Sequence, residues 1–75
     1  MTDVEFCDDF NDEYWGRGLS VHLVRNPYGV PWEMTFNAEE WNLKNLRAPC
    51  KVMRAILAEP QDTWRPRLEA LVERV

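Results

Sequence analysis

The sequence contains few of the residues that build metal and catalytic sites. Its 75 residues include one histidine and two cysteines, Cys7 and Cys50. A zinc site needs several His or Cys ligands at close spacing, and a small secreted domain usually carries four or more cysteines. We therefore expect no metal ion. We interpret both cysteines as reduced thiols that act as small apolar core residues, with a single disulfide as the alternative.

Long apolar runs and phosphate-binding loops are also missing. No stretch approaches the ~18 apolar residues of a membrane span, and the N-terminus lacks the basic and apolar regions of a secretory signal. Gly16-Arg17-Gly18 lacks the further glycines of a phosphate loop. The segment 9–13 begins like a calcium loop, but Tyr14 stands where the sixth position needs glycine. No Ser-His or Cys-His pair has local support. We expect a cytoplasmic protein without cofactors that is not an enzyme.

Positive charge is absent from the start of the chain. Residues 1–14 hold six acidic residues and no Lys or Arg, whereas the rest of the chain holds nine basic and seven acidic residues. At 100° per residue, Phe6, Cys7, Phe10 and Tyr14 fall in one arc, and most of the acids fall opposite. Thr2 followed by Glu5 fits a capping box. The pattern predicts a helix over about 3–14, and a short strand followed by an acidic loop is the alternative.

The next segment alternates with a period of two. Leu19, Val21 and Leu23 precede a turn over 26–29, and an alternating set follows the turn. Asn26, Pro27 and Gly29 are residue types that a type I turn prefers at its first, second and fourth positions. We predict an antiparallel hairpin over about 18–36 with both apolar sets facing inward, and Pro31 at an edge or bulge. The inward set after the turn is Val30, Trp32, Met34 and Phe36.

The C-terminal half has helical spacing. Asn37 is a candidate N-cap for a short helix through about Asn45, and Pro49 suits the first turn of a second helix, which Pro60 stops. The apolar stripe of this second helix is Cys50, Met53 and Leu57; that of a last helix is Trp64, Leu68, Leu71, Val72 and Val75. We predict an α+β fold in one globular domain over 1–75, in which the hairpin packs with three or four short helices.

The separation of charge points to function by binding. Five carboxylates on one helical face would span ~12 Å, a length that matches several phosphates along one DNA strand. We hypothesise that this face occupies the basic, nucleic-acid-binding surface of a partner protein, with the exposed ring of Tyr28 as an aromatic anchor. The alternative is that these acids only keep a small domain soluble. The four tryptophans are most simply core residues. The carboxylates are those of Glu5, Asp8, Asp9, Asp12 and Glu13.

The alternative function is a small nucleic-acid-binding regulator. Lys44, Arg47, Lys51 and Arg54 follow spacings of three and four, so a continuous helix would present them as one basic stripe. Pro49 interrupts this stripe, and the net charge of −4 argues against a nucleic-acid partner.

In size, acidity and lack of catalytic motifs, the chain resembles the small inhibitor and adaptor proteins that phages encode, including anti-CRISPR proteins. The resemblance is one of composition and covers no motif. It implies an inhibitor that acts in the host cytoplasm on a protein with a basic surface. We expect neither a nucleic-acid nor a membrane partner, and the oligomeric state stays open.

Overall fold

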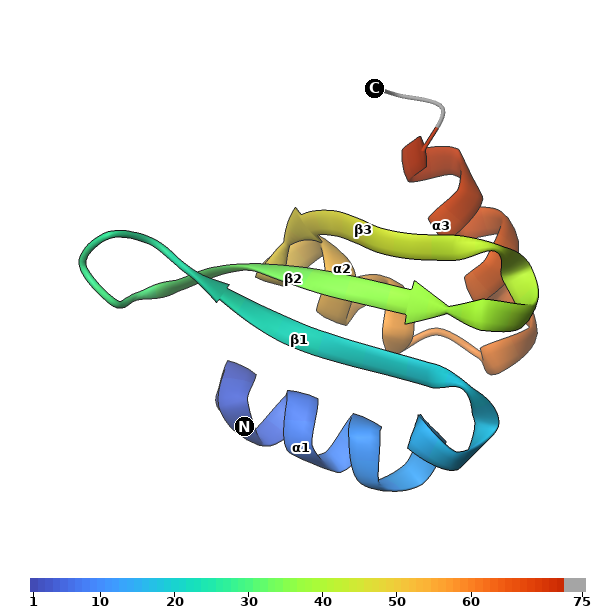
Figure 1. Ribbon diagram of the computed structural model, residues 1–75, viewed down its shortest axis with the longest axis horizontal. Helices are drawn as coiled ribbons and strands as arrows, with labels where there is room; N and C mark the ends of the chain where they lie inside the picture. Colours follow the sequence, from blue (N-terminus) through green and yellow to red (C-terminus); the bar gives the residue numbers. More distant parts are fainter. Residues whose placement is uncertain (73–75) are drawn as a thin grey trace.

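One helix, three consecutive strands and two further helices follow one another along the chain in the computed structural model, which describes residues 1–72. Figure 1 shows their arrangement. In chain order they are α1 (Asp3–Tyr14), β1 (Leu19–Arg25), β2 (Pro31–Ala38), β3 (Leu43–Pro49), α2 (Cys50–Leu57) and α3 (Trp64–Val72). Short 3-10 turns at Trp15–Arg17, Glu39–Trp41 and Gln61–Thr63 join some of these elements.

Helix α1 confirms the prediction for the N-terminus, including its start. The Thr2 side chain accepts a hydrogen bond from the Glu5 backbone N–H, and the Glu5 carboxylate accepts one from the Thr2 N–H. This capping box satisfies two N–H groups that the first turn would otherwise leave without partners. Cys7 and Phe10 are buried beneath the helix, as the apolar arc predicts.

The predicted hairpin is part of a larger sheet. β1 pairs with β2 in antiparallel register, with Val21 opposite Phe36, and β2 pairs in turn with β3. The turn closes through a hydrogen bond from the Gly29 N–H to the Asn26 carbonyl. Pro31 begins β2 beside an irregularity in the register, in agreement with its lack of a donor.

The helix predicted from Asn37 through Asn45 is wrong. Only Glu39–Trp41 form a 3-10 turn, and the chain then enters β3. Asn42 and Asn45 both have positive φ, 55° and 54°. The register of β3 against β2 shifts at this point, so the apolar residues of β3 do not alternate regularly. That broken alternation hid the strand from an analysis of periodicity.

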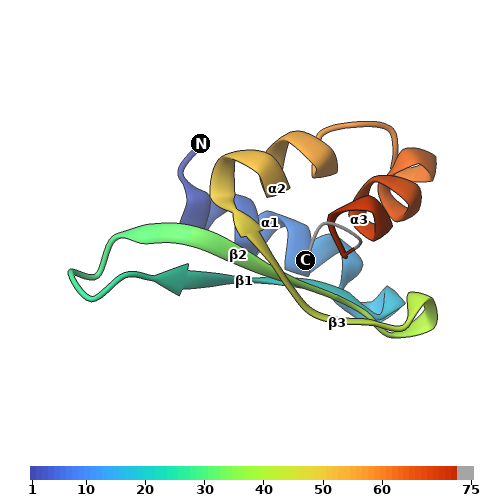
Figure 2. The same cartoon turned by 90° about the horizontal axis from the view of Figure 1, so that it is seen from above.

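The helices α1, α2 and α3 all lie on one side of the sheet, and no helix of residues 1–72 covers the other side (Figure 2). The result is a small, compact α+β structure with a three-stranded antiparallel sheet. One hydrophobic cluster fills the space between the two layers. Its most deeply buried large side chains are Phe36, Met34, Met53, Leu68 and Val21.

Two residues of the predicted inward set are exposed. Val30 is 55% and Trp32 51% exposed, whereas Met34 and Phe36 are buried. The first residue of β2 that pairs with β3 is Glu33, so the turn end of the hairpin extends beyond β3 as a projecting arm over residues 25–32 (Figure 1). Apolar side chains on this arm have no layer to pack against.

Helix α2 buries the whole stripe that its spacing predicts, and α3 buries the first part of its stripe. Cys50, Met53 and Leu57 of α2 are buried, as are Trp64 and Leu68 of α3. Leu71 is half-buried, Val72 is exposed, and Val75 lies outside the described residues. Both cysteines are buried and carry free thiols. Among the described helices, none has the length and apolar character that crossing a bilayer requires.

Candidate functional site

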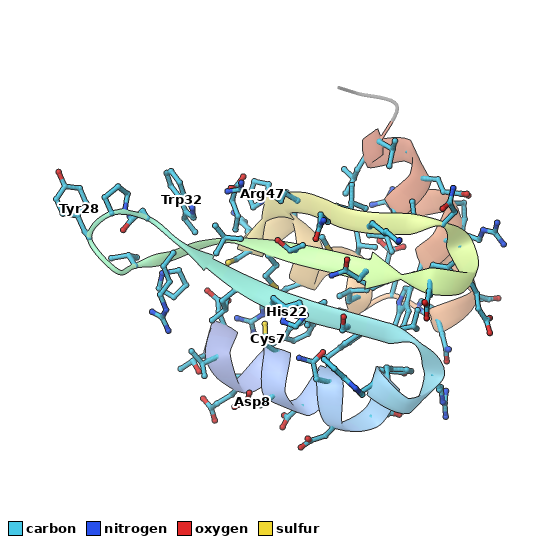
Figure 3. All side chains as sticks on the ribbon, viewed as in Figure 1. Cys7, Asp8, His22, Tyr28, Trp32 and Arg47 are labelled. Atoms are coloured by element: carbon cyan, nitrogen blue, oxygen red, sulfur yellow. The ribbon has the colours of Figure 1, made fainter. Side chains whose placement is uncertain are left out.

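The five predicted carboxylates form one exposed surface on α1, which we call the acidic face. All five side chains are exposed, and the helix lies along the edge of the sheet beside β1. Figure 3 shows Asp8 pointing away from the sheet, while Cys7 on the same helix points toward it. The structure therefore brings together the whole predicted set, Glu5, Asp8, Asp9, Asp12 and Glu13.

Side chains on the inner side of α1 hold the acidic face in place. Asn11 donates a hydrogen bond from Nδ2 to the Val21 carbonyl at 2.9 Å, and its Oδ1 accepts one from the Val21 N–H at 2.9 Å. The amide thus occupies the open edge of β1 as a neighbouring strand would. Phe10 packs its ring against Tyr14 and Trp64, at centroid distances of 4.7 and 5.6 Å. The helix is fixed to both the sheet and α3.

The ion pairs of the described residues avoid the acidic face. Four acidic residues outside the face each have an Arg partner, and none of the five carboxylates of the face has one within residues 1–72. The pairs are Arg54–Asp3 at 2.8 Å, Arg47–Glu33 at 2.6 Å, Arg67–Glu59 at 3.2 Å and Arg65–Glu69 at 3.5 Å. No ion pair among residues 1–72 therefore neutralises the negative charge of the acidic face.

This concentration of charge works against helix stability. Glu5–Asp9, Asp8–Asp12 and Asp9–Glu13 are like-charge pairs four residues apart, and two further pairs lie three apart. Each such pair destabilises a helix by about 0.2–0.5 kcal/mol. Asp12 and Glu13 also lie in the last turn, at the negative end of the helix dipole, where no basic residue offsets them.

Glu5 is the one member of the face with a local structural role. Its hydrogen bonds with the Thr2 backbone and side chain lower the pKa of the Glu5 carboxyl below its usual value. The carboxylate therefore stays ionised in the folded protein to lower pH than an ordinary glutamate. Glu5 both begins the helix and contributes charge to the acidic face.

Tyr28 does not join the acidic face. It lies at the tip of the arm, 90% exposed, and Figure 3 shows it projecting with Trp32 from the side of the arm that faces away from α1. The tip is held rigidly, because Asn26 Oδ1 accepts hydrogen bonds from the N–H groups of Tyr28 and Val30. Arg25 also donates from Nη1 to the Gly29 carbonyl at 2.8 Å. The structure thus separates two surfaces that the sequence analysis had combined.

The four predicted basic residues are divided between two elements. Lys44 and Arg47 belong to β3, whereas Lys51 and Arg54 belong to α2. Arg47 and Arg54 are engaged in ion pairs, and Arg54 also lies over the Phe6 ring, 5.3 Å from its centroid. No continuous helix carries the predicted stripe. Ion pairs compensate the charges of Arg47 and Arg54, and the other two cations, Lys44 and Lys51, lie on different elements.

Two of the four tryptophans are exposed, so the prediction that all four are core residues is wrong for them. Trp64 is buried, but Trp15 and Trp32 are 61% and 51% exposed. Trp15 meets the His22 ring edge-on at 6.1 Å and lines an open cavity of about 370 Å³ with Lys44. The exposure of Trp15 could have been predicted from its position, because it lies directly before Gly16 and outside the apolar arc of α1.

The thiols are poorly suited to nucleophilic chemistry. Burial, with a smaller contribution from nearby Cys50, raises the pKa of Cys7 to about 11, and burial also raises the pKa of Cys50. Both thiols therefore remain protonated at neutral pH. Residues 1–72 also contain no cluster of three or more His, Cys, Asp or Glu side chains arranged to hold a metal ion.

Comparisons with protein-family models, with curated proteins and with solved structures give no match for this chain. We therefore infer function from the charge and geometry of its surface.

Proposed function

We propose that the protein acts by binding, and that its acidic face occupies a basic, nucleic-acid-binding surface of a partner protein in the cytoplasm. One observation carries this proposal: the face holds five exposed carboxylates without an ion pair among residues 1–72, while four other acids are paired. Charge placed only for solubility could be spread over the chain. Here five of the eight acidic residues that have no ion pair within residues 1–72 are gathered on one helix, at a cost to the stability of that helix.

The spacing of the charges suits this role. Five carboxylates over the eight-residue interval from Glu5 to Glu13 extend ~12 Å along the helix axis, or about one charge per 3 Å. A single DNA strand carries one phosphate per ~3.4 Å. A basic groove that tracks one strand would therefore meet a similar linear density of negative charge on α1.

The fixed position of the helix also supports the proposal. The capping box, the Asn11 bonds to Val21 and the aromatic packing of Phe10 hold α1 before any partner binds. A preorganised surface loses little conformational entropy on binding. Complementary charge would mainly raise the association rate, and that rate would fall as salt rises. An inhibitor of the kind that phages encode, such as an anti-CRISPR protein, would work in this way.

The test compares three immobilised forms of the protein as baits in host lysate. The first is the parent chain, and the second is Asp9→Asn/Asp12→Asn/Glu13→Gln. The third is a control that removes the same charge from exposed acids outside α1, Glu39→Gln/Glu40→Gln/Asp62→Asn. We expect a protein that the parent and control retain, that the acidic-face variant loses, and that excess duplex DNA displaces.

Two results would contradict the proposal. One is retention of the same proteins by all three baits, which would make the acidic face irrelevant to binding. The other is retention of the parent chain on a heparin column at low salt, because a polyanion should repel the acidic face. Heparin retention that Lys44→Glu and Lys51→Glu abolish would instead support the nucleic-acid-binding alternative.

A further inference from the structure

An apolar groove of about 480 Å³ lies between α2 and α3. Each wall contains two residues that are four positions apart on one helix, Lys51 and Ala55 on α2 and Arg67 and Leu71 on α3. Such residues are about one turn, or ~6 Å, apart along the helix axis. The α2 wall includes Lys51, Val52 and Ala55, and the α3 wall includes Arg67, Ala70 and Leu71.

Apolar side chains in this groove are left in contact with solvent. Val52 is 39% exposed, because it lies outside the buried stripe of α2, which includes Met53 and Leu57. Ala55 and Ala70 line the groove as small, exposed side chains, so the space between the walls is not filled. A partner's larger apolar side chains would bury this surface without moving the core.

The charge around the groove indicates the kind of partner. Among residues 1–72, its lining includes two cations, Lys51 and Arg67, and no acidic residue. Arg67 is paired with Glu59 at 3.2 Å, but its side chain is 59% exposed, so further N–H groups of the guanidinium can reach a second carboxylate. This basic rim contrasts with the acidic face of α1.

We propose that this groove binds an acidic amphipathic helix of a partner protein. Apolar residues four apart on such a helix repeat at the same ~6 Å as the residues of each wall. Helices commonly dock in this way, with their apolar face in a groove and their polar flanks at its rim. Glutamates beside the apolar stripe would pair with Lys51 and Arg67. The inference does not depend on the acidic face, which would repel a helix of this charge.

The test uses a fluorescent helical peptide of about four turns (~14 residues), with leucines four apart flanked by glutamates. A second peptide carries lysines in place of the glutamates, and dodecanoate serves as a non-peptide probe. Binding is measured by fluorescence anisotropy and mapped by NMR on the isotope-labelled full chain. We expect the acidic peptide to bind at least ~10-fold more tightly than the lysine peptide and to shift the Val52, Ala55 and Ala70 amide signals.

Variants locate the binding. Lys51→Glu reverses one rim charge, and Ala70→Glu places a carboxylate inside the groove; each should weaken the acidic peptide by ~10-fold or more. Lys44→Glu makes the same charge change on β3, outside the groove, and should change affinity by less than ~2-fold. Either groove variant suffices if the other fails to fold, as judged by its melting curve.

The proposal is overturned if the acidic peptide does not bind at millimolar concentration, or if both peptides bind equally. It is also overturned if Lys44→Glu weakens binding as much as Lys51→Glu, or if the shifted signals lie outside the groove. Binding of dodecanoate without binding of the acidic peptide would assign the groove to a small amphiphile instead.

Discussion

Neutralising the last turn of α1 should stabilise the protein. The double variant Asp12→Asn/Glu13→Gln removes three like-charge contacts, those of Asp12 with Asp8 and Asp9 and that of Glu13 with Asp9. At about 0.2–0.5 kcal/mol each, these contacts account for roughly 0.6–1.5 kcal/mol. Removing two negative charges from the negative end of the helix dipole adds a further gain, which solvent exposure keeps at the low end of its usual ~0.3–1 kcal/mol per charge.

We therefore expect the free energy of unfolding of the double variant to exceed that of the parent by about 1–2 kcal/mol in low salt. For a domain of this size, 1 kcal/mol corresponds to roughly 4–8 °C in melting temperature. Urea denaturation at low salt and at 1 M salt is the measurement. The gain should largely vanish at 1 M salt, where the screening length is only ~3 Å.

The matched control is Glu39→Gln/Glu40→Gln, which removes the same charge from exposed positions outside α1. Its stability should stay within about 0.5 kcal/mol of the parent for each substitution. A double variant of α1 that is no more stable than the parent, or a gain that survives in 1 M salt, would refute the view that the acidic face is held at a cost in stability.

Three further predictions concern the fold. Asn11→Ala should cost about 2–3 kcal/mol, because it leaves the Val21 N–H and carbonyl without partners; hydrogen exchange at Val21 should accelerate, and unchanged protection would contradict this. Phe36→Ala should cost about 3–5 kcal/mol by urea denaturation, whereas Trp32→Ala on the arm should cost less than about 1.5 kcal/mol, so equal losses would argue against the projecting arm. Cys7, with its pKa raised to about 11, should resist thiol reagents until the chain unfolds. Because the unfolded state loses this proton at lower pH than the folded state, stability should fall between about pH 9 and 11, and a flat profile there would count against the buried thiol.

Local chemistry made the N-terminal half of the fold predictable. The capping box at Thr2 marks the start of α1, and the apolar arc of Phe6 to Tyr14 marks its buried side. Both patterns involve residues only a few positions apart in the sequence. The turn at 26–29 sets the hairpin in the same way. The acidic face was predictable for the same reason, since the position of five carboxylates on a helix follows from the helical period alone.

Contacts between distant parts of the chain decided the rest. β3 is a strand because β2 pairs with it, although its apolar residues do not alternate regularly in the sequence. Asn42, directly before it, and Asn45, within it, adopt left-handed backbone conformations. Trp32 has the period of a core residue, but burial depends on what lies across from it, and β3 ends too early to cover the arm.

The distribution of charge shows the same division. The sequence determined how much negative charge α1 carries and on which side, because both depend on neighbours within four residues. Only the tertiary structure decided which charges remain without partners. Arg54 neutralises Asp3 across 51 positions of the chain, and the other three arginine pairs likewise form away from the acidic face. The helical period encodes only the Arg65–Glu69 pair, four residues apart on α3; the other three depend on where separate segments of the chain meet in space.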